Sequence, residues 1–131
     1  MKTIKTLAIL LFSLNTFSQV QTELETSING TYLKGGYNYE FNNRFIIGGS
    51  AGYEFMSSNV DYKLNITTGY NIDDYLYFNT DFGFINWRRN DIKTNKYFFD
   101  FGFTYVTERN ILFDLKISTV DFINFGIGYK F

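Results

Sequence analysis

The sequence predicts an all-β fold: a closed, eight-stranded, antiparallel up-and-down transmembrane β-barrel with a polar, filled lumen. Three observations lead to this prediction. From Val20 onward, apolar residues recur with a period of two, which is typical of strands with two different faces. Aromatic residues make up 21% of the 131 residues, more rings than a small soluble core encloses. Every charge within the expected strands falls on the face opposite the rings.

Residues 1–18 are expected to form a secretory signal peptide that is removed, which leaves residues 19–131 as one barrel domain. Lys2 and Lys5 precede an apolar stretch over residues 7–12, and small polar residues follow it. This stretch is far shorter than the roughly 20 apolar residues of a membrane-spanning helix. Without the two lysines, the 13 acidic residues outnumber the basic ones, a balance that does not favour nucleic acid binding.

The chain contains no cysteine and no histidine. These absences exclude disulfides, zinc or haem sites built on these residues, and Ser-His or Cys-His catalysis. The serines have no histidine to activate them, so a lipid hydrolase of the familiar kind is not expected. We therefore predict that the protein is not an enzyme and has no catalytic residue, cofactor or metal site.

The first four strands are expected over residues 20–28, 31–41, 45–56 and 62–72. Most of these spans are close to the roughly 9 to 11 residues of a tilted membrane strand. One face of each is apolar or uncharged, and it consists of Leu24, Thr26, Ile28; Leu33, Tyr37, Tyr39, Phe41; Phe45, Ile47, Ala51, Tyr53, Phe55; and Tyr62, Leu64, Ile66, Tyr70, Ile72.

The last four strands are expected over residues 76–87, 96–107, 111–118 and 122–131. They follow the same alternation and carry most of the phenylalanines on one face. That face consists of Leu76, Phe78, Phe82, Phe84; Tyr97, Phe99, Phe101, Phe103, Tyr105; Ile111, Phe113, Leu115, Ile117; and Ile123, Phe125, Ile127, Tyr129, Phe131.

Turn-forming residues separate these strands. Asn29-Gly30 favours a two-residue hairpin turn, because both residues readily adopt a positive φ, and such a turn would pair Glu25 with Lys34. If the mature chain starts in the periplasm, three uniform short turns fall on that side, as is usual for outer-membrane barrels. These are three-residue loops at 42–44, 73–75 and 108–110. The other four connections, which are Asn29-Gly30 and residues 57–61, 88–95 and 119–121, then lie on the outer side.

The width of the barrel decides which face is inside. An eight-stranded barrel is just wide enough to be filled by side chains, so the face that is dense with rings is too bulky for the lumen. The opposite face has room for long polar side chains because it carries glycines. We expect the rings to face lipid, and the alternative is a soluble, lipocalin-like barrel with the faces reversed. The glycines are Gly36, Gly48, Gly52, Gly69, Gly83, Gly102, Gly126 and Gly128.

The charges on the polar face are expected to form a network in the lumen, because an unpaired buried charge costs several kcal/mol. A structural salt-bridge plug is the favoured interpretation, and a gated ion path or proton-coupled site is the alternative. The candidates are Glu25, Lys34, Glu40, Glu54, Lys63, Asp81, Asp100, Asp114, Lys116 and Lys130, with Glu23 as a further acid.

A basic cluster surrounds the longest outer loop. It consists of Trp87 at the membrane edge with Arg88, Arg89, Lys93 and Lys96. Such a cluster could hold the phosphates of lipopolysaccharide, since arginine makes bidentate contacts with phosphate. A solvated loop, broken by an aspartate, explains the same residues equally well.

The last strand, residues 122–131, resembles the C-terminal signature of bacterial outer-membrane barrels: alternating apolar residues, Tyr129 third from the end and Phe131 at the end. Together with the signal peptide and the eight strands, the mature chain resembles the small OmpA/OmpX-type barrels. The resemblance implies that Tyr129 and Phe131 are recognised by the barrel-insertion machinery. The short outer loops and the lack of a periplasmic domain depart from that family.

These observations predict a non-enzymatic protein of the bacterial outer membrane with a structural or surface-binding role. Its expected partners are outer-membrane lipid, including lipopolysaccharide, and the insertion machinery during biogenesis. The alternatives are a soluble secreted barrel that encloses an apolar ligand and a minor narrow channel.

Overall fold

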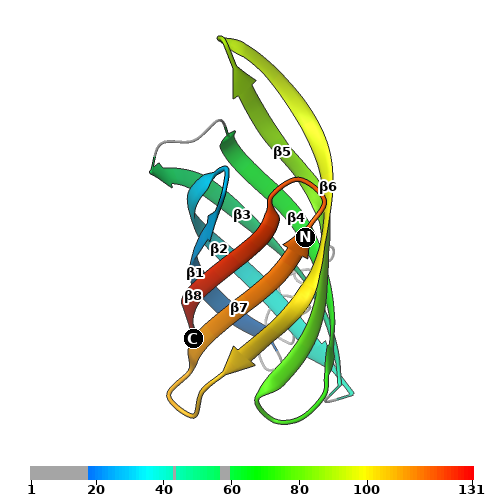
Figure 1. The fold of residues 1–131 in the computed structure, drawn as a ribbon. Coiled ribbons are helices and arrows are strands. Elements are labelled where there is room, and N and C mark those ends of the chain that lie inside the picture. The colour runs from blue at the N-terminus through cyan, green and yellow to red at the C-terminus, as the bar shows by residue number, and fades with distance from the viewer. Residues whose placement is uncertain (1–17, 43, 57–59) are drawn as a thin grey trace, which may run out of the picture.

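The computed structural model describes residues 18–42, 44–56 and 60–131, which form one closed barrel of antiparallel strands (Figure 1). This confirms the predicted fold class. The expected signal peptide lies outside the described residues, apart from its last residue. No helix in the described part is long and apolar enough to cross a membrane. The strands are β1 (Ser18–Ser27), β2 (Gly30–Phe41), β3 (Phe45–Met56), β4 (Val60–Asn71), β5 (Leu76–Arg89), β6 (Ile92–Val106), β7 (Ile111–Ser118) and β8 (Phe122–Lys130).

Each strand pairs with its neighbours in sequence, and β1 pairs with β8 to close the barrel. The β2–β3, β4–β5 and β6–β7 connections lie at one end, which we call the turn end, and the other four lie at the hairpin end. The expected three-residue loops at the turn end agree with the backbone pairing, although Asn43 is outside the described residues. The residues that flank these loops pair as Phe41 with Phe45, Ile72 with Leu76 and Thr107 with Ile111.

The β1–β2 turn differs from the prediction by one position. Ser27 pairs with Gly30, so the two turn residues are Ile28 and Asn29 rather than Asn29-Gly30. Gly30 becomes the first residue of β2 and adopts a φ of 140°, a conformation that L side chains rarely adopt. The Asn29 side chain donates a hydrogen bond to Asp121 Oδ1 at 2.6 Å, which ties this turn to the β7–β8 turn.

The strand register therefore also differs from the expected one. Glu25 pairs with Tyr32 rather than with Lys34, a shift of two residues along β2. A shift of two leaves every side chain on its original face, so the inward and outward assignments remain valid. The predicted contact survives diagonally, because Lys34 Nζ still lies 2.6 Å from Glu25 Oε2.

The predicted loop over residues 88–95 is wrong. β5 continues to Arg89 and β6 begins at Ile92, so the hairpin projects well beyond the rest of the barrel (Figure 1). Its turn consists of Asn90 and Asp91, with φ values of 51° and 63°. A two-residue turn with both residues in the left-handed region matches the twist of the strands, and Asn and Asp tolerate that conformation.

The rings lie outside the barrel and the charges inside. Phe99 and Phe103 are 43% and 49% exposed, whereas Asp81 and Asp100 are 1% and 0% exposed. Glycines on the inner face make room for the long polar side chains. A Cβ atom added to Gly52 would lie 2.7 Å from Cγ of Lys34, which is closer than real carbon atoms approach.

Two small apolar clusters lie inside the barrel, one on each side of the charged residues. Both consist of inward-facing residues, so they narrow the lumen on either side of its charged middle. The hairpin-end cluster is Tyr32, Ile85 and Phe98, against which Trp87 and Val120 pack, and the turn-end cluster is Ile46, Tyr77 and Val106.

The outward-facing position of Ile66, which is 60% exposed, allows a test of the membrane face. We expect Ile66→Arg to destabilise the barrel in phospholipid vesicles by about 2–4 kcal/mol, because it places a charge in hydrocarbon. Ile92→Arg, the same change at the projecting hairpin tip, should cost about 1 kcal/mol or less. Denaturant unfolding in vesicles measures both, and equal losses would contradict the assignment of this face to lipid.

Candidate functional site

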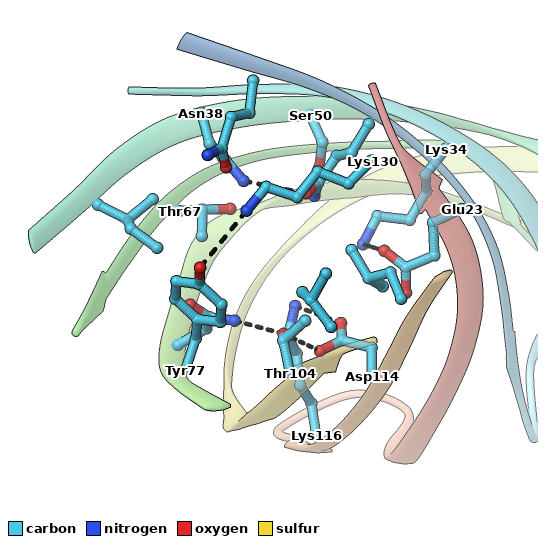
Figure 2. A pocket seen from close by; sticks show the side chains of 16 residues that line it. Glu23, Lys34, Asn38, Ser50, Thr67, Tyr77, Thr104, Asp114, Lys116 and Lys130 are labelled. Carbon is cyan, nitrogen blue, oxygen red and sulfur yellow. Dashed lines mark hydrogen bonds and ion pairs between the residues drawn. The ribbon is translucent and has the colours of Figure 1, made fainter. Parts of the chain in front are cut away.

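The charged side chains of the lumen form the candidate site. Among the described residues, nine charged side chains are buried, and inward-facing strand positions supply all but Asp121. Figure 2 shows how several of them converge on a cavity between the strands. They are the acids Glu23, Glu25, Asp81, Asp100, Asp114 and Asp121, and the lysines Lys34, Lys63 and Lys116.

Lys63 on β4 is the centre of the part of this network nearer the hairpin end. Its Nζ lies 2.7 Å from Glu25 Oε1, 3.2 Å from Asp100 Oδ2 and 3.5 Å from Asp121 Oδ2. The same ammonium lies 4.5 Å from the centroid of the Phe98 ring, which adds a cation–π contact. One buried lysine thus contacts acids from β1, β6 and the β7–β8 turn.

Lys116 on β7 organises the other part of the network. Its Nζ lies 2.7 Å from both Asp81 Oδ2 and Asp114 Oδ2. Thr67 donates a hydrogen bond to Asp81 Oδ1 at 2.6 Å, and Thr104 donates one to Asp114 Oδ1. Lysine and hydroxyl donors therefore reach both oxygens of each of the two aspartates.

Lys34 on β2 pairs with the two glutamates of β1. Its Nζ is 2.6 Å from Glu25 Oε2 and 3.8 Å from Glu23 Oε2. Glu25 thus accepts from two lysines, since Lys63 holds its other oxygen. Buried ion pairs of this kind add little net stability over apolar packing, but removing one partner is costly because the other charge stays desolvated.

Three of the expected lumen residues lie away from this network. Glu54 is at the hairpin end, where its Oε2 is 3.9 Å from Arg88. Glu40 is half-buried near the turn end, and Lys130 donates to the Tyr77 hydroxyl at 3.4 Å. The strand pattern places a residue on a face but not at a depth, so it could not distinguish these positions from the central ones.

Asp121 is a member that sequence reasoning missed. It lies in the expected connection 119–121, where the period of two carries no information about side-chain direction. The structure turns it inward, to 1% exposure, between Lys63 and Asn29. The feature that identifies it is the contact with the Asn29 turn. This contact exists only in the closed barrel, so the sequence alone does not show it.

The aromatic residue of the expected basic cluster points inward. Trp87 packs on the hairpin-end cluster instead of lying at the membrane edge, because the ladder continues past it with the same alternation. Lys96 lies over its ring, with Nζ 4.3 Å from the centroid. The side chain of Arg89 lies outside the described residues.

The remaining basic residues of the hairpin have acidic neighbours. Arg88 lies 3.4 Å from Asp61, and Lys93 lies 3.2 Å from the other oxygen of the same carboxylate. The Arg88 and Lys93 side chains are 45% and 62% exposed. Ion pairs exposed to this extent are weak, so an external anion could exchange with Asp61.

The chain end lies on the barrel wall. The Tyr129 and Phe131 rings are in an edge contact, with centroids 5.0 Å apart, and they are 43% and 69% exposed. The Phe131 amide donates to the Val20 carbonyl oxygen at 2.8 Å, which anchors the last residue to β1. Both side chains are thus accessible from outside the barrel.

Comparison with protein-family models and with curated protein sequences finds no match. Among solved structures, a de novo designed transmembrane β-barrel is similar at 18% identity, with a TM-score of 0.58 over 87% of this chain and 94% of that chain. The outer-membrane protein Ail of Yersinia pestis, in a phospholipid nanodisc, is similar at 17% identity, with a TM-score of 0.55 over 87% and 98%. The chain therefore has the fold of the small eight-stranded outer-membrane β-barrels.

Because Lys63 contacts several buried acids, the stability of the barrel should be sensitive to the loss of this lysine. Lys63→Met should destabilise the barrel by about 3–5 kcal/mol, because Glu25 and Asp100 remain buried with a partner removed. Lys93→Met removes an exposed partner of Asp61 and should cost at most about 1 kcal/mol. Denaturant unfolding of the two refolded variants checks this difference, and a Lys63 variant as stable as the wild type would contradict the importance of this lysine.

Proposed function

We propose that the chain is a non-enzymatic protein of the bacterial outer membrane, exported with a cleaved signal peptide, that acts through its outer surfaces. The observation that carries this proposal is the combination of an apolar outer wall with a filled interior. Rings cover the outside, and buried ion pairs and two apolar clusters occupy the lumen. A barrel built in this way has its lipid-facing wall and its projecting hairpin available for contact.

The filled interior argues against the channel alternative. Tyr32, Ile85 and Phe98 narrow the lumen toward the hairpin end, and the ion pairs of Lys63 and Lys116 occupy its middle. Moving an ion along this path would require breaking several buried ion pairs at once, each at a cost of several kcal/mol. A structural plug therefore explains the network better than a gated path does.

The cavity argues against the apolar-ligand alternative. The cavity among the lumen side chains has a volume of about 30 Å³ and is lined by charged and amide groups such as Glu23, Lys34 and Asn38. A pocket for a small organic ligand typically has about 300–1,000 Å³ and mostly apolar walls. The lumen thus suits water or a small ion rather than a lipid-like molecule.

We further propose that the hairpin of β5 and β6 contacts the phosphates of lipopolysaccharide at the cell surface. The support is the exposure of Arg88 and Lys93 on the element that projects farthest from the barrel. Asp61 already holds both cations, and a phosphate group carries more charge and more acceptor oxygens than this carboxylate.

Fractionation and conductance test the main proposal together. We expect the protein in the detergent-soluble outer membrane, with altered gel mobility on boiling, because a closed barrel resists unfolding in detergent. In planar bilayers it should show no steady conductance, since the lumen is filled. Recovery as a freely soluble monomer would support the secreted-barrel alternative, and a reproducible open state would support the channel.

The proposed role of the chain end in insertion has its own test. Phe131→Ala should lower the amount of folded barrel in the outer membrane severalfold, while leaving the stability of the refolded barrel nearly unchanged. Phe125→Ala removes an outward ring of the same strand and should leave insertion close to wild type. Heat-shift gels of membrane fractions measure both, and equal insertion of the two variants would end this assignment.

A further inference from the structure

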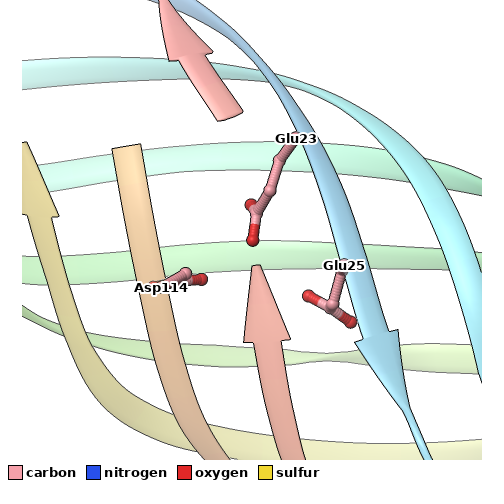
Figure 3. A group of neighbouring side chains, drawn as sticks. All are labelled: Glu23, Glu25 and Asp114. Atoms are coloured by element: carbon pink, nitrogen blue, oxygen red, sulfur yellow. The ribbon is translucent and has the colours of Figure 1, made fainter. Parts of the chain in front are cut away.

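The part of the lumen network around Lys63 and the part around Lys116 approach each other at three acidic residues. Glu23, Glu25 and Asp114 each place a carboxylate oxygen within 4.8 Å of the others. Figure 3 shows the two glutamates on β1 and the aspartate on β7 pointing into the space between them. We call these three residues the carboxylate cluster. Like charges at this distance repel strongly in a desolvated lumen, so the cluster needs compensating positive charge.

Gly126 on β8 forms the floor of the cluster. It pairs with Glu25 on one side and with Asp114 on the other. A Cβ atom at this position would collide with Glu23 Oε1, so the absence of a side chain makes the space that this oxygen occupies. The Glu23 carboxylate therefore lies over β8, between the other two acids.

Glu23 supplies a second, independent observation. Its side chain is 3% exposed, and its Oε1 has no hydrogen-bond partner. Its other oxygen is 3.8 Å from Lys34 Nζ, too far for a hydrogen bond. A buried carboxyl oxygen without a hydrogen-bond donor is costly, so this atom points to a ligand.

The lysines do not balance the charge. Lys34 and Lys116 lie next to the carboxylate cluster, and Lys63 also contacts Glu25. Two of these lysines are shared with acids outside the cluster, Lys116 with Asp81 and Lys63 with Asp100 and Asp121. Over all described residues, six buried acids face three buried lysines. A monovalent cation offsets part of this surplus negative charge, whereas a divalent ion would be repelled more strongly by the neighbouring ammonium groups.

The cavity gives such an ion space and a path. Its volume of about 30 Å³ is enough for about two water-sized spheres. Glu23 and Asp114 line it, and so do Gln19, Gln21 and Asn38 on the side of the turn end. These amide side chains could pass a partly hydrated ion from the turn-end mouth to the cluster.

We propose that Glu23, Glu25 and Asp114 bind a hard monovalent metal cation, Na⁺, inside the barrel. Oxygen ligands are those that hard cations prefer, and ligand distances of about 2.3–2.6 Å, as for Ca²⁺, allow two oxygens on opposite sides of one ion to lie up to about 5 Å apart. The ion joins the two parts of the salt-bridge network through Glu23 Oε1, an oxygen that the lysines leave without a hydrogen bond. This site lies inside the barrel and is independent of the surface role proposed above.

Thermal unfolding of the refolded wild-type barrel tests the site. Its Tm is measured in non-ionic detergent with NaCl, with N-methyl-D-glucamine chloride and with CaCl₂ at equal ionic strength. At a tenfold excess of Na⁺ over Kd, we expect a Tm roughly 3 to 6 °C higher than with the organic cation, and saturation as NaCl rises. The same Tm in all three salts, or a rise with CaCl₂ alone, overturns the proposal.

Glu23→Gln separates ion binding from a merely structural salt bridge. It should abolish the response to Na⁺, and with the organic cation it should be at least as stable as the wild type, because it relieves repulsion. Glu40→Gln, an acid of the same lumen outside the cluster, should keep the response. A Glu23→Gln barrel that is destabilised equally in every salt contradicts the site.

A measurement on the wild type covers the case in which Glu23→Gln does not fold. Sodium NMR of the barrel in detergent should show a linewidth increase that Gly126→Ala reduces, because the added methyl group takes the space of Glu23 Oε1. A linewidth equal to that of empty detergent micelles overturns the proposal.

Discussion

Inside an eight-stranded barrel the lumen is only as wide as the side chains that fill it, so any charge placed there loses most of its water. This constraint explains why the inner face combines glycines with long charged residues. Gly52 makes room for the stem of Lys34, and Gly126 makes room for the Glu23 carboxylate. It also explains why each buried lysine contacts at least two acids, since few donors are available to each carboxylate.

The narrow lumen also leaves the outer surfaces of the barrel, rather than its middle, as the place for function. A lumen that is occupied by ion pairs and bounded by apolar clusters leaves little room for an organic ligand. The outer wall, with its exposed rings, and the β5–β6 hairpin, which projects farthest, are the surfaces that remain. The lumen can still accept a small ion, because the buried acids outnumber the buried lysines. Pairing within the chain therefore does not compensate all of the buried negative charge.

Local sequence signals were least reliable where a connection interacts with another part of the barrel. Asn29-Gly30 is a strong hairpin signal, yet the turn uses Ile28 and Asn29, because the Asn29 side chain is held by Asp121 from the opposite end of the chain. The sequence predicts a loop over residues 88–95, after Trp87. The β5–β6 ladder nevertheless continues to a tight turn at Asn90 and Asp91.

The sequence by itself determined the number of strands, their order and the direction of nearly every strand side chain, because a period of two is a property of the local backbone. It also determined that Lys63 and Asp100 face the lumen. Only the tertiary structure decided how deep each side chain lies in the lumen and which residues it contacts. Strand tilt and closure bring Lys63 to Asp121, send Glu54 to the rim, and place Glu23 beside Asp114 across β8. These neighbours are set by the stagger of the whole barrel, which no single strand encodes.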